Sequence, residues 1–480
     1  MKKETKQNAL NAHTWMGVFL SVGLYLVCLS GTLAVFYQEF ERWEQPEITE
    51  METVSSVAVE RAMSQFMSAH PEETDHYYVV FPTSGIPRLV VENDHIAYFA
   101  DKDGNLITQE NVLFTKMLVD LHLYLNLPAS WGMILVSILG AIICGLVITG
   151  IVAHKRITKD AFKLRRKGSG QQYQTDLHNR FGLWATPFHL IIGVTGAYFG
   201  MAGVLLTVVA QLYYDGDRDA VSAQIFTPDP VLEQAIALPN VEKAVAQMET
   251  LAPDSQPLFL TVHEANTSDQ FIEIFAKVPG KLIYSENYRF DTQGNYLGTA
   301  GYADGSWGKQ AVYAMYRLHF GDFAGVPSKT LYFVLGMMLT ALCISGMEIW
   351  LAKKANPPMA CRLWAAMVWG SIGALALTAV VDMLTSLPLV GVFWVLLLAC
   401  IVSAVTLPAM IKPRWQQFSG LCVFTLVVVY TLYHGKGSLN LAALQLNVPL
   451  MVYGLWAMWR GQTLVKRHFY HGIQVKAEGV

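Results

Sequence analysis

Eight long apolar runs constrain the fold of this 480-residue chain more than any other feature. A run of about 20 apolar residues can cross a bilayer as a helix, which satisfies its own backbone hydrogen bonds. Hydrophobic residues make up 53% of the chain and charged residues only 15%, which is typical of multi-span membrane proteins. The sequence therefore predicts an α-helical bundle of about eight transmembrane helices. The predicted spans are residues 15–37, 129–152, 182–208, 328–351, 363–381, 387–410, 417–433 and 441–459.

Charge is distributed unevenly between the segments that connect the spans. Residues 38–128 carry 16 acidic against 5 basic residues, and residues 209–327 carry 15 against 7. Because cytoplasmic loops have an excess of Lys and Arg, we expect both acidic segments in the periplasm and both termini in the cytoplasm of a bacterial inner membrane. The loop after the second span carries the largest group of basic residues, which are Lys155, Arg156, Lys159, Lys163, Arg165, Arg166 and Lys167.

The two large periplasmic segments share one order of local patterns. A helical stretch, at residues 55–68 or 239–251, leads to alternating apolar runs and then to a turn at Gly104 or Gly294, each followed by Asn. A Gly-Asn turn between apolar runs is typical of a β-hairpin. Each segment is therefore predicted to be a small α+β module. The strand-like runs are residues 77–81, 258–262 and 271–275.

Matching residues also recur in the first four spans. His13 and His178 precede the first and third spans with the same His-x-x-x-Gly spacing, and Leu-His precedes the second and fourth spans at His122 and His319. These matches indicate a pseudo-twofold repeat of helix, outer module, helix. A hydroxyl residue before glycine has two explanations that stay open, which are close helix packing and room for a flat macrocycle. These pairs are Ser30-Gly31, Thr149-Gly150, Thr195-Gly196 and Ser345-Gly346.

Six histidines flank or enter the first four spans, and they are His13, His122, His154, His178, His189 and His319. Counting 1.5 Å per residue from the centre of each span places His13, His154 and His178 in an inner layer. His122 and His319 fall near the outer surface. Paired imidazoles on facing helices are what a six-coordinate haem b needs. We therefore predict haem b, in two copies at two depths, with the pairing of the histidines left open.

His189 lies between the two layers, eleven residues after His178. On one continuous helix this spacing would put both imidazoles on the same side, about 16 Å apart. An imidazole inside a bilayer is costly and usually has a partner. The two histidines are therefore either ligands of stacked metal centres, or one boundary residue and one hydrogen-bonded core residue.

Zinc is the competing metal, but it usually takes three or four ligands that include thiolates or carboxylates. The inner layer offers basic neighbours instead, namely Lys155, Arg156 and Arg180, which suit haem propionates. The six cysteines lie in or beside apolar runs and form no CxxC motif. We recognise no flavin or NAD(P) site in the chain, because no glycine-rich dinucleotide fingerprint follows a strand. Electrons are therefore expected from a cytoplasmic flavin or NAD(P)H reductase, or from quinol.

Together these residues resemble a known family over residues 8–355. The family comprises bacterial inner-membrane proteins with PepSY-associated transmembrane helices, and it includes ferrisiderophore reductases. The resemblance implies two PepSY-like modules in the periplasm, haem b held by transmembrane histidines, and reduction of a ferric siderophore with release of Fe(II). The residues that carry it are His13-x-x-x-Gly17, Leu121-His122, the run from Thr149 to Phe162, Asp176-x-His178, Pro187-Phe188-His189 and Leu318-His319-Phe-Gly321.

The alternative function is a non-redox PepSY membrane protein that binds or regulates peptidases or senses ligands. A transporter is disfavoured because the spans contain almost no carboxylates for coupling ions. The lipid bilayer is an expected partner and nucleic acid is not. The expected divisions are a first transmembrane helix (1–37), PepSY-like module 1 (38–128), helices 2 and 3 (129–208), PepSY-like module 2 (209–327), helix 4 (328–355), and a four-helix membrane extension with a cytoplasmic tail (356–480). The extension is expected to be a scaffold or a partner-docking bundle.

Overall fold

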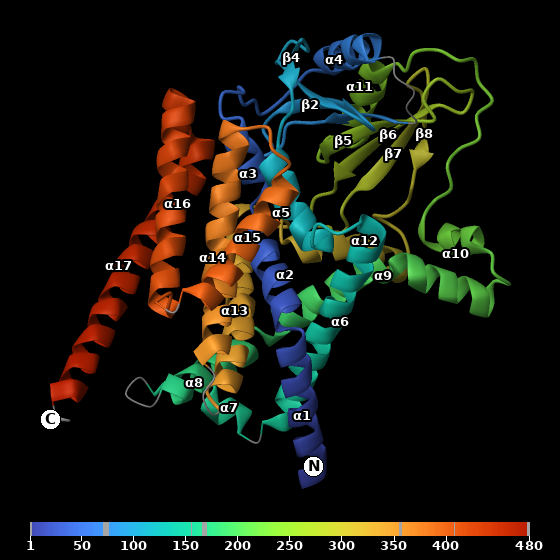
Figure 1. The fold of residues 1–480 in the computed structure, drawn as a ribbon. Coiled ribbons are helices and arrows are strands. Elements are labelled where there is room, and N and C mark those ends of the chain that lie inside the picture. The colour runs from blue at the N-terminus through green and yellow to red at the C-terminus, as the bar shows by residue number, and fades with distance from the viewer. Residues whose placement is uncertain are drawn as a thin grey trace. The chain divides into compact units, whose positions relative to one another are not determined.

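The structure, a computed structural model, divides into two compact units (Figure 1). We call Met1–Pro46, Val112–Gly200 and Thr330–Val480 the helical unit, and Glu47–Asn111 with Met201–Lys329 the sheet unit. The predicted basic residues Lys155, Arg166 and Lys167 lie outside the described residues. The structure describes residues 2–70, 76–154, 156–165, 170–354, 358–407 and 409–477, without the side chains of residues 157 and 466–477.

Apolar helices make up the helical unit, and two of them, α9 and α13, continue into the sheet unit. They are α1 (Lys3–Phe19), α2 (Ser21–Ala34), α3 (Tyr37–Glu44), α5 (Leu113–Tyr124), α6 (Ala129–Ala153), α7 (Ile157–Asp160), α8 (Gly170–Trp184), α9 (Thr186–Tyr213), α13 (Val326–Leu351), α14 (Pro358–Leu384), α15 (Leu389–Thr406), α16 (Lys412–His434), the short 3₁₀ helix η1 (Gly435–Leu439) and α17 (Leu441–Ala477).

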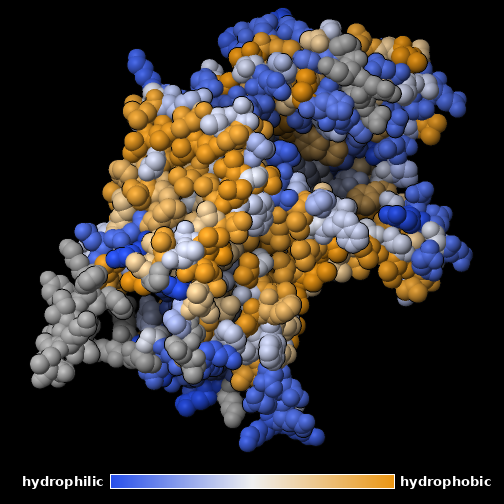
Figure 2. Space-filling model, in the orientation of Figure 1, coloured by the Kyte–Doolittle hydropathy of each residue, from blue (hydrophilic) through white to orange (hydrophobic). Residues whose placement is uncertain are grey.

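Within the described residues, seven helices are long and apolar enough to cross a membrane, or eight if α1 and α2 form one span. Those two helices meet at a 70° bend around Leu20, so the first predicted span is broken. Many apolar side chains of the helical unit are exposed, and Figure 2 shows broad hydrophobic surface over its helices. Exposed apolar surface of this extent needs lipid around it. The chain is therefore a multi-pass membrane protein.

One helix occupies the middle of the helical unit. In α14, 72% of the most apolar 18-residue stretch is buried inside the protein. In the other six candidate spans, 11–39% of the corresponding stretch is buried. The difference arises because α14 packs against both α15 and α16, and its small residues allow close approach. Gly373, for example, faces the ring of Phe418 at a distance that leaves no room for a side chain. The four-helix extension is thus organised around α14.

The third predicted span is wrong in one respect. Residues 182–208 do not form one uninterrupted helix with the residues before them, because α8 ends at Trp184 and α9 starts at Thr186. Pro187 explains the interruption, since proline has no backbone N–H and disfavours helical geometry in the residue before it. His178 and His189 therefore lie on two different helices, and the three-turn argument that placed them on one side does not apply.

The sheet unit contains one antiparallel sheet of eight strands in the order β4-β3-β2-β1-β5-β6-β7-β8. Strands β1 and β5 join its two halves, with Val79 opposite Leu260. The helices α4 (Ser56–Ala69) and α11 (Val241–Leu251) share one hydrophobic core with it. The strands are β1 (Tyr77–Val80), β2 (Leu89–Asn93), β3 (Ala97–Ala100), β4 (Leu106–Gln109), β5 (Gln256–His263), β6 (Phe271–Lys277), β7 (Glu286–Asp291) and β8 (Tyr296–Thr299), and the other helices are α10 (Arg218–Ile225) and α12 (Trp307–Phe320).

The predicted segments 38–128 and 209–327 both contribute to this sheet. The predicted helical stretches, strands and hairpin turns are present, but the two segments form one unit with a common core. Helices α3 and α5, which flank the first segment, belong to the helical unit instead. The physical reason is that each four-stranded half leaves an apolar edge strand, which pairing with the other half satisfies.

The turn glycine of each half packs against the start of the helix of the same half. Gly104 has φ +82°, and a Cβ there would lie 2.2 Å from the carbonyl oxygen of Ala58. Gly294 has φ +72°, and its Cβ would lie 2.8 Å from the carbonyl oxygen of Asn240. Both positions thus require glycine for conformation and for space.

Candidate functional site

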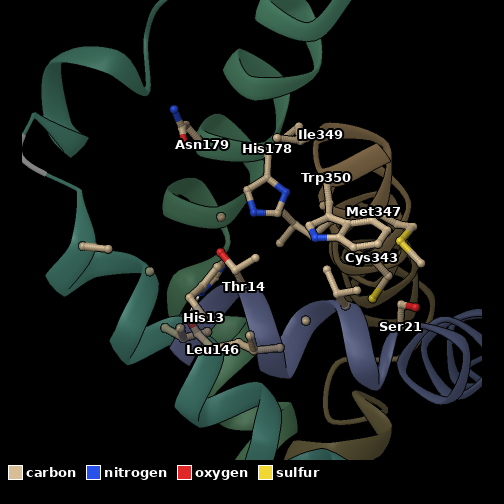
Figure 3. Close-up of a pocket in the computed structure, with 18 of the residues that line it drawn as sticks. His13, Thr14, Ser21, Leu146, His178, Asn179, Cys343, Met347, Ile349 and Trp350 are labelled. Atoms are coloured by element: carbon tan, nitrogen blue, oxygen red, sulfur yellow. Dashed lines mark hydrogen bonds between the residues drawn. The ribbon is translucent and has the colours of Figure 1, made fainter. Parts of the chain in front are cut away.

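A cavity of about 420 Å³ in the helical unit is lined by four of the six predicted histidines (Figure 3). His13 comes from α1, His154 from the end of α6, His178 from α8 and His189 from α9. Most of the remaining lining is apolar and comes from α1, α6 and α13. The histidines that the sequence assigned to the inner layer therefore gather at one site, together with His189.

Two contacts position the His13 ring. Its Nδ1 lies 3.0 Å from the carbonyl oxygen of Leu146 and 3.3 Å from Oγ1 of Thr149. The Thr149 hydroxyl donates its own proton to the Gly145 carbonyl, so both oxygens near the ring act as acceptors. Nδ1 therefore carries the proton, and the lone pair remains on Nε2, the form of histidine that binds metals. A Cβ at Gly150 would lie 3.2 Å from the ring.

His178 has matching surroundings on α13. Its Nδ1 lies 3.0 Å from Oγ of Ser345, and the Ser345 hydroxyl donates to the Leu342 carbonyl. The serine oxygen therefore accepts from Nδ1–H, which again leaves the lone pair on Nε2. A Cβ at Gly346 would lie 3.4 Å from the His178 ring. Gly346 therefore accommodates the His178 ring in the same way as Gly150 accommodates the His13 ring.

The imidazoles of His13 and His178 lie edge to face, at a centroid separation that suits one shared metal ion. The ring centroids of His13 and His178 are 6.1 Å apart and the ring planes are perpendicular. Two metal–nitrogen bonds of about 2.0–2.1 Å, plus about 1.1 Å from each nitrogen to its ring centre, give a separation of about 6.3 Å. Figure 3 shows His178 projecting from its helix toward His13 and Trp350.

His189 is fully buried and lines the same cavity. Neither of its ring nitrogens has a hydrogen-bond partner among the described residues. Leaving a buried polar group without a partner costs about 1–3 kcal/mol. An orphaned imidazole in a cavity lined by other imidazoles indicates that a group absent from the protein chain completes the site.

His154 differs from the other three histidines of the cavity. Its Nδ1 accepts the backbone N–H of Arg156 at 3.2 Å, and its Nε2 lies 3.9 Å from a carboxylate oxygen of Asp160. The lone pair is thus already engaged, and the proton is on the nitrogen that faces the carboxylate. This arrangement orients His154 at the rim of the cavity and makes it a poorer metal ligand than His13 or His178.

The predicted outer pair is divided between the two units. His122, on α5, is in the helical unit, where its Nδ1 lies 3.0 Å from the Val27 carbonyl. A Cβ at Gly31 would lie only 2.4 Å from the His122 ring. His319, on α12, belongs to the sheet unit. The pairing of these two histidines stays a prediction.

The hydroxyl–glycine pairs have a more specific use than either explanation drawn from the sequence. At three of them the glycine accommodates an imidazole ring, namely Gly31, Gly150 and Gly346. The fourth pair, Thr195-Gly196, lies where α9 packs on α6, and Ser137 donates to the Gly196 carbonyl at 3.1 Å. Three of the glycines therefore leave space for a histidine ring to pack against a neighbouring helix, and the fourth lies where two helices pack together.

Among the residues that the structure describes, no group of three or more His, Cys, Asp or Glu side chains is arranged to hold a metal ion. Of the predicted propionate partners, Arg180 donates to the carbonyls of Ala161 and Phe162 and covers the Trp184 ring. Sequence reasoning missed Cys343, Met347 and Trp350, which line the cavity from α13. Their helical spacing from Gly346 was the available signal.

Comparison with known proteins identifies the class. Residues 10–353 match the PepSY-associated TM region family, and the chain belongs to this family. An uncharacterized protein of Pseudomonas aeruginosa is 26% identical over 256 residues. That alignment covers 50% of this chain and 64% of the relative, so the chain spans less than two thirds of the relative's length.

Proposed function

We propose that this protein is a haem b-containing inner-membrane oxidoreductase that passes electrons from the cytoplasmic side to ferric siderophores in the periplasm, with release of Fe(II). The observation that supports the proposal is the pair His13 and His178, with centroids 6.1 Å apart and each Nδ1 bonded to an acceptor. A haem iron needs two such imidazoles, one from each side of the ring.

The chain's own residues support this site in three ways. The acceptors at Nδ1 orient each ring and raise the basicity of Nε2, as outer partners of metal-bound histidines commonly do. Gly150 and Gly346 let the two rings lie close to α6 and α13, the helices that carry these glycines. The apolar lining, with Trp350 beside His178, keeps water from the ring faces. When bound, haem supplies reversible one-electron transfer.

Haem is better supported than zinc at this cavity. Structural zinc takes four protein ligands and catalytic zinc takes three, whereas haem iron takes only two from the protein. No three metal-binding side chains of the described residues are arranged around one point. The unpartnered His189 remains available as a replacement for either member of the pair.

The substrate follows from the chemistry of iron. Siderophores bind Fe(III) through hard oxygen ligands, and the addition of one electron weakens that preference and labilises the iron. A reductase therefore needs an electron at its outer face and a docking surface, and it needs no acid–base residues. The sheet unit, built from acidic segments, would dock a neutral or cationic iron complex.

The test is spectroscopic. Protein purified in detergent from haem-replete cells is expected to show a Soret band and to give the pyridine haemochrome of haem b. After reduction with dithionite and removal of the excess, ferrioxamine or ferrichrome should reoxidise it. A folded, colourless preparation would contradict the haem site and favour a non-redox member of the family. A coloured preparation that no hydroxamate or catecholate siderophore reoxidises would contradict the substrate.

A further inference from the structure

A second cavity, of about 680 Å³, lies in the helical unit where α13 and α14 meet the start of α16. Apolar residues form most of its wall, and it belongs to none of the histidines discussed above. Two of its three helices, α14 and α16, come from the extension for which the sequence predicted a scaffold or a partner-docking bundle. Its lining residues include Leu351, Arg362, Trp364, Ala365, Val368 and Ile411.

Two N–H donors in this wall lack acceptors. Trp364 is only 6% exposed, and its Nε1 has no hydrogen-bond partner among the described residues. The same holds for Nε of Arg362, whose Nη2 donates to Sδ of Met359 at 3.4 Å. A buried donor without an acceptor destabilises the folded protein. The pair therefore indicates a ligand that is apolar overall and carries oxygen acceptors.

The second cavity shares a helix with the histidine cavity. Gly346 and Trp350 of α13 line the histidine cavity, four residues apart. Glu348 and Leu351 of α13 line the second cavity from another side of the same helix. The helix α13, about 10 Å across, therefore contributes to the walls of both spaces.

We propose that the second cavity binds the headgroup of an isoprenoid quinol, which is the electron donor; this inference rests on the proposed function. The oxygens of the quinol ring accept from Trp364 Nε1–H and Arg362 Nε–H, and the isoprenoid tail follows the apolar wall. Oxidation removes two electrons and two protons from the quinol and leaves the quinone. The two electrons would leave one at a time toward the haem that His13 and His178 would hold, and they would account for the reduction of two ferric siderophores.

A carboxylate at the wall can accept the protons. Glu348 forms an ion pair with Lys412 there, and it can pass a proton to water at the Lys- and Arg-rich end. Glu348 offsets the charge of Lys412, and Arg362 adds one cation. The mostly apolar wall suits the ring and isoprenoid tail of a quinol better than the strongly hydrated phosphate of a lipid headgroup.

The first experiment measures binding without turnover. Decylubiquinone is added to the detergent-purified full chain, and thermal unfolding is followed by circular dichroism. Binding to the folded protein should raise the unfolding temperature in proportion to the logarithm of quinone concentration. Trp364→Phe and Arg362→Met should reduce the apparent affinity about tenfold, because each loses one hydrogen bond. Trp459→Phe and Arg460→Met, at exposed sites on α17, are the matched controls.

The second experiment follows haem reduction by decylubiquinol in a stopped-flow spectrometer. Wild-type protein and both controls should be reduced at similar rates, and the two cavity variants about tenfold more slowly at subsaturating quinol. Ala352→Trp, which fills the cavity from an exposed position, should block reduction by quinol but not by dithionite. The Ala352→Trp variant tests the quinol site if the Trp364 and Arg362 variants do not fold.

The outcomes separate the two proposals. Absence of haem from wild-type protein contradicts the proposed function. Haem that dithionite reduces but quinol does not, or equal quinone affinity in wild-type protein and both cavity variants, contradicts the quinol site alone. Reduction only by reduced flavin or a flavoprotein would also contradict it and would identify the other donor class.

Discussion

The surroundings of His13 and His178 are alike in geometry and differ in chemistry. Each ring lies against a glycine of a neighbouring helix, Gly150 or Gly346, and each Nδ1 meets an oxygen one turn or less before that glycine. The nearest acceptor of His13 is a backbone carbonyl, whereas that of His178 is a serine hydroxyl. His178 also has a backbone carbonyl partner, that of Leu342. Both copies therefore position the histidine with one carbonyl and one hydroxyl, and they differ in which of the two is nearer.

Removing either ring should have the largest effect. His13→Ala and His178→Ala are each expected to abolish the six-coordinate haem spectrum of the inner site, because the iron loses one axial ligand. His154→Ala, whose lone pair already accepts the Arg156 N–H, should retain that spectrum and is the control. Absorption spectra and haem-to-protein ratios measure both. Imidazole added to the buffer should partly restore the His178→Ala spectrum.

The outcome also tests the pairing. If His178→Ala keeps an unchanged spectrum while His189→Ala loses it, the pair His13 and His178 is not the ligand set, and His189 has replaced His178. Equal retention in all three single variants would mean that these histidines pack the helices and hold no haem.

The turn glycines of the sheet allow a second comparison between the copies. Gly104→Ala should destabilise its hairpin by about 2–4 kcal/mol, because the new Cβ would strike the Ala58 carbonyl at 2.2 Å. Gly294→Ala, with 2.8 Å to the Asn240 carbonyl, should cost about 1–2 kcal/mol less. Hydrogen exchange of the β4 and β8 amides measures both in the full chain. A larger loss of protection at β8 would show that the backbone at Gly104 relaxes.

A buried carboxyl distinguishes the first half of the sheet in its response to pH. Burial, with the nearby carboxylates of Glu110 and Asp94, raises the pKa of Glu92 to about 7 from an ordinary value of 4.5. The folded state then holds this proton more tightly than the unfolded state. Stability should therefore be greatest below pH 4.5 for this group and fall as pH rises through 7.

Glu92→Gln should remove that dependence and raise stability at pH 8 by about 1–3 kcal/mol. The second half provides the contrast. Burial there also opposes the charged form, but hydrogen bonds from His263 and Arg289 outweigh it and lower the pKa of Glu273. Thermal unfolding of both proteins between pH 5 and 8 measures the difference. Parallel plots of unfolding temperature against pH for wild type and Glu92→Gln would contradict the raised pKa of Glu92.

The smallest expected effect compares the two hydroxyls. Ser345→Ala removes the nearest acceptor of His178 and leaves the Leu342 carbonyl, whereas Thr149→Val leaves His13 with its nearest acceptor, the Leu146 carbonyl at 3.0 Å. Loss of one outer partner of a metal-bound histidine typically costs tenfold or more in affinity. We expect about tenfold weaker haem retention in Ser345→Ala and about twofold in Thr149→Val, measured by transfer of haem to apomyoglobin. The reverse order would mean that His178 depends on a backbone carbonyl.

Local patterns predicted most elements of this fold. Residues 55–68 and 239–251 are helices and the Gly-Asn turns close hairpins, because these features depend on neighbouring residues. The union of the half-sheets depends on pairing between Val79 and Leu260, and no local pattern encodes a contact so distant in sequence. Pro187 favours an interruption before His189, but the long apolar run around it indicated one continuous span.

The candidate site could be predicted in its residue types but not in its geometry. The shared spacing of His13 and His178 indicated a related pair, and the structure places their rings face to edge. The tautomers could not be read from sequence, since they depend on acceptors that other helices supply. Nothing in the sequence distinguishes His154 from His178 as a ligand. In the structure, Nδ1 of His154 accepts the Arg156 N–H, whereas Nδ1 of His178 bonds to Ser345 and leaves the lone pair on Nε2.

The seam between β1 and β5 imposes an order on synthesis. Strand β1 ends at Val80 and β5 begins at Gln256, and the candidate spans α6 and α9 lie between them in sequence. During translation the first half-sheet must therefore wait with the apolar edge Tyr77–Val80 unpaired while two further helices enter the membrane. Open edges of this kind invite pairing with other chains. Slow insertion of α6 or α9 would thus expose the nascent protein to aggregation or proteolysis before its second half arrives.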